Sequence, residues 1–275
     1  MKSYYLRNTE LKHSLTKSTH EMILEICTGT VTGVEAARRG GAHRVELCSS
    51  LETGGLTPSA GLMEAACGME GFKKHVLIRP RTGDFLYSKM EKAVMLTDIR
   101  RAQSLGADGI VVGALTTDGL IDTEFMKACR NEAPTLSLTF HRAFDLAARP
   151  HEALEQIIAC GFQRVLTSGQ AATAEAGIPL LQQIIKQAAG RIIIMPGCGI
   201  TPSNVQRIIR ETGAQEIHAS AKGLMKSNMR FRLQDAHMGM ATNDEYQWTD
   251  TSEETVKALK LALSVSGHAF KQREG

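Results

Sequence analysis

Two short segments of the chain carry a carboxylate and a thiol at matching positions. Leu24–Cys27 and, 21 residues later, Val45–Cys48 each consist of an aliphatic residue, Glu, a second aliphatic residue and Cys. In a β-strand successive side chains point to opposite faces, so the Glu and the Cys of each segment share one face. A helix-like run, Thr32–Arg39, fills the interval, and strand–helix–strand units of this length have parallel strands. We therefore predict that Cys27 and Cys48 end adjacent strands at the sheet edge where α/β folds build their sites.

Residues after other predicted strands suit an anion. Arg79 and Arg142 follow two of these strands, and a guanidinium offers forked donors to a carboxylate or phosphate. Gly197 and Gly199 belong to a turn whose backbone N–H groups, with a helix starting near residue 203 and the inward Ser220, would complete such a site. A solvated surface pair of arginines and an ordinary tight strand–helix turn are the alternatives.

The inward carboxylates and one histidine are candidates for acid/base chemistry. Glu25, Glu46 and His141 share the strand face that carries the cysteines. Buried charge is costly unless it is paired, so a structural ion network, for example between Glu46 and Arg79, is the alternative explanation.

Composition narrows the function classes. The chain has 275 residues, 43% hydrophobic, with 32 Lys and Arg against 29 Asp and Glu. This mild charge, without a basic run that contains aromatics, argues against nucleic acid, and no apolar stretch is long enough to span a membrane. Residues 1–21 are polar and are expected to form a disordered or flexible tail before one domain at 22–275. Six cysteines without a secretion signal indicate free thiols in a reducing compartment.

Eight aliphatic runs alternate with helical patterns, which predicts a (β/α)8 barrel of the TIM type; a doubly wound open sheet is the alternative. Several helices are predicted to stop at a glycine just before the next strand. The aliphatic side chains of each strand should face the surrounding helices. The predicted strands are Met22–Cys27, Arg44–Cys48, His75–Arg79, Gly109–Gly113, Leu136–His141, Arg164–Ser168, Arg191–Met195 and Glu216–Ser220.

Seven motifs along the chain carry a family resemblance: Glu25–Cys27, Gly40–Cys48, Gly54–Ser59, Ile78–Ser88, Thr139–Asp145, Val165–Gly169 and Met195–Ile200. Together they resemble the CutC family of copper-homeostasis proteins from about residue 22 onward. The resemblance implies a TIM-type barrel, an intracellular protein that is often dimeric, and Cu(I) binding through Cys27 and Cys48. Two positions depart from the family pattern: Thr28–Thr30 lacks the usual acidic residue, and Cys198 replaces a glycine.

Two functions follow as expectations. The first is a cytoplasmic, and also nuclear, homodimer that binds a copper ion, since thiolates favour soft ions such as Cu(I). Two sulfurs that bind one ion from opposite sides would lie about 4.5 Å apart if the metal–sulfur bond has the length of a zinc–sulfur bond. This separation is close to the spacing of neighbouring strands, roughly 4.8 Å. A disulfide between the two cysteines is also compatible with that spacing. The second is an enzyme acting on a small phosphorylated, anionic metabolite. Met225, Met229 and the run His237–Met240 also contain soft donors, for which packing is the simpler role.

Overall fold

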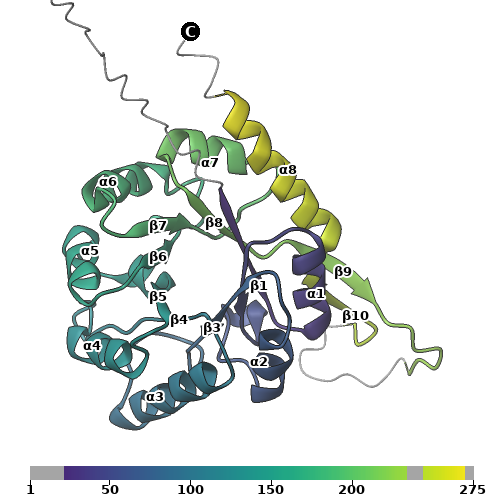
Figure 1. Ribbon diagram of the computed structural model, residues 1–275, viewed down its shortest axis with the longest axis horizontal. Helices are drawn as coiled ribbons and strands as arrows, with labels where there is room; N and C mark the ends of the chain where they lie inside the picture. The colour runs from purple at the N-terminus through teal and green to yellow at the C-terminus, as the bar shows by residue number, and fades with distance from the viewer. Residues whose placement is uncertain (1–21, 234–243, 270–275) are drawn as a thin grey trace, which may run out of the picture.

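Eight parallel strands form the centre of the computed structural model, which describes residues 22–233 and 244–269 (Figure 1). Each strand pairs with the next from β1 to β7, β8 pairs with β1, and β7 lies beside β8. The sheet is therefore a (β/α)8 barrel and not a doubly wound open sheet. The strands are β1 (Ile23–Thr28), β2 (Arg44–Leu47), β3 (Lys73–Leu77), β4 (Gly109–Val112), β5 (Ser137–Phe140), β6 (Arg164–Thr167), β7 (Ile193–Pro196) and β8 (Glu216–Ala219).

All eight predicted strands are present, and none of their ends moves by more than two residues. The largest shift is in β3, which was predicted at His75–Arg79 and begins at Lys73. Strand pairing depends on the backbone, whereas the prediction followed the apolar side chains. Lys74 fits in the strand because its stem is buried while its Nζ donates to the carbonyls of Met69 and Phe72.

Helices surround the barrel on its outside (Figure 1). Side chains of Thr30, Ser59, Ser88 and Asp122 cap the first turns of α1 to α4 by accepting backbone N–H groups. The four glycines predicted to end helices, at 41, 106, 161 and 213, have φ between 74° and 88°, as that role requires. The helices are α1 (Val31–Arg39), α2 (Ala60–Cys67), α3 (Lys89–Ser104), α4 (Thr123–Glu132), α5 (Pro150–Ala159), α6 (Ile178–Ala188), α7 (Val205–Thr212) and α8 (Glu253–Ala269), with 3₁₀ turns at Leu51–Thr53 and Arg142–Leu146.

The main hydrophobic core lies between the strands and the helices. Every strand residue predicted to face outward belongs to one buried cluster with apolar helix residues. The inner face of the barrel carries charged and polar side chains and a separate small apolar group, as the side-chain parity predicts. The outward residues are Leu24, Ile26, Val45, Leu47, Val76, Ile78, Leu138, Phe140, Ile217 and Ala219.

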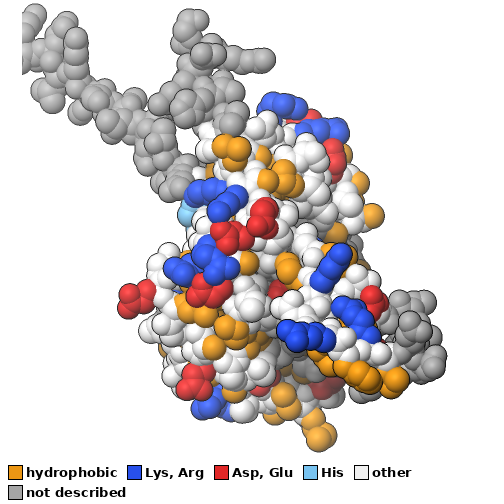
Figure 2. Space-filling view, turned by 90° about the vertical axis from the view of Figure 1, so that its right-hand side faces the viewer, with side chains coloured by type: hydrophobic (Ala, Val, Ile, Leu, Met, Phe, Trp, Pro, Cys, Tyr) orange, Lys and Arg blue, Asp and Glu red, His pale blue; other side chains and the backbone are white. Residues whose placement is uncertain are grey.

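A two-stranded hairpin lies in the connection between β8 and α8, where no strand was predicted. Strands β9 (Lys222–Lys226) and β10 (Gln247–Thr251) pair antiparallel outside the barrel. The pattern missed them because alternate residues of β9, such as Leu224, are exposed. Figure 2 faces this side of the molecule and shows hydrophobic side chains beside lysines and arginines. No helix among the described residues is long and apolar enough to cross a membrane.

Candidate functional site

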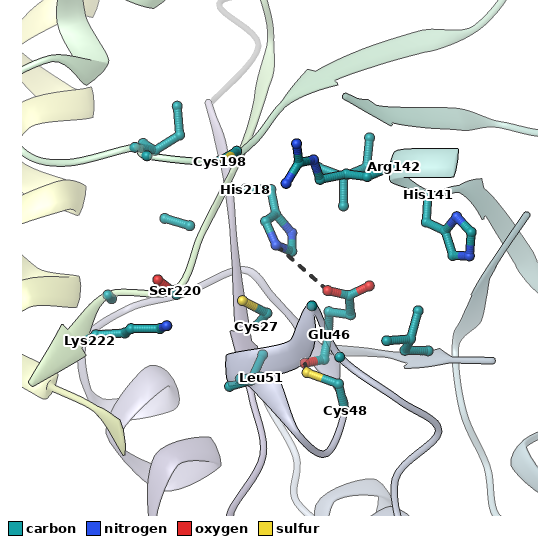
Figure 3. Close-up of a pocket in the computed structure, with 18 of the residues that line it drawn as sticks. Cys27, Glu46, Cys48, Leu51, His141, Arg142, Cys198, His218, Ser220 and Lys222 are labelled. Atoms are coloured by element: carbon teal, nitrogen blue, oxygen red, sulfur yellow. Dashed lines mark hydrogen bonds and ion pairs between the residues drawn. The ribbon is translucent and has the colours of Figure 1, made fainter. Parts of the chain in front are cut away.

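A cavity of about 510 Å³ opens at the carboxyl ends of the strands (Figure 3). The barrel topology brings strand ends from all around the sheet to this one place. Of the predicted site residues, Glu25 and Gly197 do not line the cavity. Those that do are Cys27, Glu46, Cys48, Arg79, His141, Arg142, Gly199 and Ser220.

Cys27, Glu46 and His218 form a buried cluster in one wall of the cavity. The Cys27 sulfur, a Glu46 carboxylate oxygen and a His218 ring nitrogen all lie within 4.8 Å of one another. The strand register explains this arrangement, because Cys27 of β1 is directly opposite Glu46 of β2 and His218 comes from β8 on the other side of β1. His218 Nε2 lies 3.6 Å from Glu46 Oε2, the contact drawn in Figure 3.

A second carboxylate orients His218 from beneath. Glu25 Oε1 lies 2.7 Å from His218 Nδ1, and both groups are buried. Glu25 also accepts from Arg44, which in turn bridges to Glu216. Arg164 donates to the two oxygens of Glu216 at 2.7 and 3.2 Å. The layer below the cavity is thus a buried ion network that fixes the imidazole ring from one side.

This network shifts the protonation of the groups above it. Burial by itself raises the pKa of Glu25, but Arg44 and His218 outweigh it and hold that pKa well below its usual range. Burial likewise disfavours the charged form of His218, yet Cys27 and the two carboxylates raise its pKa well above the usual value. Glu46 has fewer compensating cations, so burial raises its pKa to about 7. Glu46 is therefore the carboxyl group of the cavity that can exchange a proton near neutral pH.

Cys48 lies in the same wall, two residues after Glu46, the residue that is paired with Cys27 in the sheet. Its backbone N–H donates to the carbonyl of Thr28, the residue after Cys27. Cys48 therefore lies nearer the carboxyl end of the barrel than the pair of Cys27 and Glu46. The two cysteines share a small buried apolar group with Leu77 and Val111. Burial and the neighbouring Cys27 raise the pKa of Cys48 well above its usual value. The predicted pair of strand-end thiols is present, with the stagger of the barrel offsetting one from the other.

The two predicted anion-binding arginines have different partners. Arg142 pairs with Asp145 at 2.7 Å and donates to the Ser168 hydroxyl. Arg79 is buried and donates to backbone carbonyls, so the suggested ion pair between Glu46 and Arg79 is wrong. Glu46 faces His218 instead, because β2 turns its carboxylate toward β1 and β8.

The turn after β7 is tight and strained. A side chain at Gly197 would lie 2.5 Å from Leu166, and Gly199 has φ of 71°. Cys198 has φ of 85°, a left-handed conformation that costs a non-glycine residue about 1–3 kcal/mol, and its sulfur donates to the Ala172 carbonyl at 3.2 Å. The following helix begins at Val205 rather than near residue 203. A helical turn opened by Pro202 had been counted as helix in the prediction.

Because Cys198 is partly exposed, we predict that its thiol reacts faster than that of the buried Cys129. Cys198 is half-buried and lines the cavity, whereas Cys129 is fully buried in α4, where burial raises its pKa to about 12. We expect a neutral maleimide to label Cys198 within minutes and to leave Cys129 unmodified in the folded protein. Peptide mass spectrometry of samples quenched at successive times measures both. Equal rates at the two cysteines would contradict the position of Cys198.

Several contributors to the site were not chosen from the sequence. His218 was not among the predicted site residues, and Arg44 and Arg164 were not considered as partners of the inward carboxylates. His218 could have been recognised from the sequence, because it lies two residues after Glu216 and therefore on the same face of the last predicted strand. The partners of Arg44 had no such signal, because they depend on which strand closes the barrel. Met225 and Met229 do not line the cavity, and His237–Met240 and the predicted tail at 1–21 lie outside the described residues.

Comparison with known proteins agrees with the architecture. The profile of the CutC family matches residues 22–223. A family protein CutC of Chromobacterium violaceum is 46% identical over 243 residues, covering 88% of this chain and 98% of that protein. The copper homeostasis protein cutC homolog of Homo sapiens is 46% identical over 238 residues, covering 86% and 87%.

Solved structures agree as well. The crystal structure of a copper homeostasis protein CutC from Streptococcus agalactiae matches with a TM-score of 0.69 and 34% identity, covering 72% of this chain and 98% of that chain. Thiamine phosphate pyrophosphorylase from Pyrococcus furiosus, at 14% identity and a TM-score of 0.55, shares the fold alone. On the family match and these identities, the chain belongs to the CutC family.

Proposed function

We propose that this protein acts in copper homeostasis by binding one Cu(I) ion at the mouth of the barrel, through the thiolates of Cys27 and Cys48 with His218 Nε2 as a third donor. The observation that carries the proposal is the buried cluster of Cys27 with His218 and Glu46, which has the second thiol beside it. The names of relatives such as the human copper homeostasis protein cutC homolog support the same metal.

The chemistry of the donors fits a soft ion. Two sulfurs and an imidazole nitrogen favour Cu(I), whereas the single carboxylate of Glu46 is a harder donor. Glu25 bonds the other nitrogen of the His218 ring at 2.7 Å, the arrangement by which carboxylates orient metal-ligating histidines. Because its raised pKa keeps the His218 ring protonated in the free protein, ligation through Nε2 would release that proton as well as one from a thiol, and Glu46 can take up one of them.

Titration tests the stoichiometry. We expect the full-length protein to compete with a coloured Cu(I) chelator for one equivalent of copper, and the variant with Cys27→Ser and Cys48→Ser to lose this competition. The same titration with Zn²⁺ is the comparison, because zinc prefers four ligands in a tetrahedral arrangement. Affinity for Cu(I) that is unchanged in the double variant, or tighter binding of zinc than of copper, would overturn the proposal.

A second function is favoured by the size of the cavity. A volume of about 510 Å³ falls in the range of small-molecule sites and exceeds what one ion occupies. In an enzyme acting on a small phosphorylated metabolite, Glu46 would be the acid/base group, because its pKa of about 7 suits proton transfer. Burial lowers the pKa of His141 to about 3, so this residue would serve as a neutral hydrogen-bond donor. Glu25 would act by positioning, because it does not line the cavity.

The proposal extends to assembly and location. We propose a homodimer that works in the cytoplasm and also in the nucleus, without nucleic acid or membrane as a partner. The exposed apolar side chains near the hairpin, including Leu224, Phe231 and Trp248, give a second copy of the chain a surface to pack against.

A further inference from the structure

Arg79 is a buried cation whose contacts do not neutralise its charge. Its two terminal nitrogens donate to the carbonyls of Thr53, Gly55 and Gly83 at 2.9 to 3.2 Å. Within residues 22–233 and 244–269 it forms no ion pair with a carboxylate, and the buried Tyr87 hydroxyl, a neutral group, is a further polar neighbour of its guanidinium. A buried guanidinium without a carboxylate is costly in the folded protein, so an anion that reached it would gain both a charge and a hydrogen bond.

His141 presents a second donor on the same side of the cavity. Its Nδ1 accepts the backbone N–H of Ala143 at 3.1 Å, which leaves the proton on Nε2. Nε2 is buried and has no partner among the described residues. Gly113 makes room for this ring, since a Cβ there would lie 2.7 Å from His141 Nδ1.

Phe85 joins the two donors into one wall. Its ring lies 4.8 Å from the His141 ring and 5.1 Å from the Arg79 guanidinium carbon, and all three side chains line the cavity. Phe85 is half-buried, and its ring packs against both the guanidinium and the imidazole. Figure 3 shows His141 across the cavity from Ser220 and Lys222.

We propose that the wall of Arg79, Phe85 and His141 binds the oxyanion of a small organic molecule, a carboxylate or a phosphate ester, with the Arg79 guanidinium as its countercharge and His141 Nε2–H as a donor. This site is separate from the thiol cluster and does not depend on copper. It also differs from the site predicted around Gly199 and Ser220, and the other arginine of that prediction, Arg142, is already paired with Asp145. The ligand's remaining atoms extend into the cavity toward Glu46, which lies on the thiol side.

Metal-free protein tests this site with inorganic phosphate and malonate as probes, each at an ionic strength matched with chloride. We expect one of the two to raise the melting temperature and to saturate in calorimetry, and which of them binds distinguishes a phosphate from a carboxylate. Binding should persist in the variant with Cys27→Ser and Cys48→Ser, which separates this proposal from copper binding. If neither probe shifts the melting temperature beyond chloride, the proposal fails.

Two substitutions of His141 provide a matched pair. His141→Asn can still accept the Ala143 N–H but lacks the distal donor, and we expect its Kd to be about tenfold weaker or more. His141→Gln places an amide N–H near the position of Nε2 and should bind within about threefold of the native protein. Equal binding by His141→Asn and the native protein would mean an adventitious ion only and would overturn the site.

Arginine variants supply the charge control. Arg79→Gln should abolish the response to the anion, whereas Arg81→Gln should not change it, because Arg81 is half-exposed and already paired with Asp84 and Glu91. Arg79 also ties three loop carbonyls, so Arg79→Gln must first melt cooperatively without ligand. If Arg79→Gln does not fold, the comparison of His141→Asn with His141→Gln tests the proposal instead. Loss of binding in Arg81→Gln alone would place the anion on the surface loop and overturn the proposal.

Discussion

Replacing Cys27 alone by serine is expected to weaken Cu(I) binding by more than about 100-fold. Its sulfur is the one that lies within 4.8 Å of both the His218 nitrogen and the Glu46 carboxylate. Changes in groups that only support a metal ligand typically cost about 10–100-fold in affinity, so the loss of a central ligand should exceed that range. Competition against a Cu(I) chelator of known affinity, at fixed pH and without oxygen, measures the effect.

Cys48→Ser should cause a smaller loss of copper affinity, because Cys48 follows the end of β2 and does not belong to the cluster of Cys27, Glu46 and His218. Cys67→Ser is the matched control: Cys67 is half-buried in α2, away from the cavity, and its loss should leave copper affinity unchanged. Equal losses from Cys27→Ser and Cys48→Ser would contradict a centre built on Cys27 and would indicate an ion held equally by the two sulfurs.

The barrel and its two faces could be predicted because both depend on local patterns. Alternation along a strand separates Leu24 and Ile26 from Glu25 and Cys27 without knowledge of any neighbour, and the structure confirms both faces. Glycines such as Gly41 mark helix ends because only glycine adopts their conformation at low cost. Each of these patterns can be recognised within a single strand or helix, without information about the register between strands.

The partners of the inward residues could not be predicted in the same way. The contact of Cys27 with Glu46 depends on the register of β1 against β2, and the contact of Glu25 with His218 depends on β8 closing against β1. Alternation fixes a face but not a register. This is why Glu46 was suggested as the partner of Arg79.

The ion network beneath the site predicts a large effect on stability. Arg44→Met keeps an unbranched apolar side chain in place of the arginine stem but leaves Glu25 and Glu216 without the cation that bridges them in the barrel interior. Breaking one partner of a buried ion pair costs about 3–5 kcal/mol, and we expect that loss in the free energy of unfolding measured with urea. Arg38→Met is the control: Arg38 is 44% exposed and pairs with Glu35 only at the surface, so its loss should cost less than about 1 kcal/mol.

A double variant separates lost charge compensation from lost packing. Glu25→Gln in the Arg44→Met background removes the charge of one of the two carboxylates that lost Arg44, while the amide oxygen of Gln can still accept from His218 Nδ1. If the cost of Arg44→Met arises from an uncompensated buried charge, the double variant should be more stable than Arg44→Met alone, by about 1–3 kcal/mol. If it arises from packing against Met195, which Arg44 also contacts, the second change should add its own cost. A double variant less stable than Arg44→Met would therefore contradict an electrostatic role for Arg44 beneath the site.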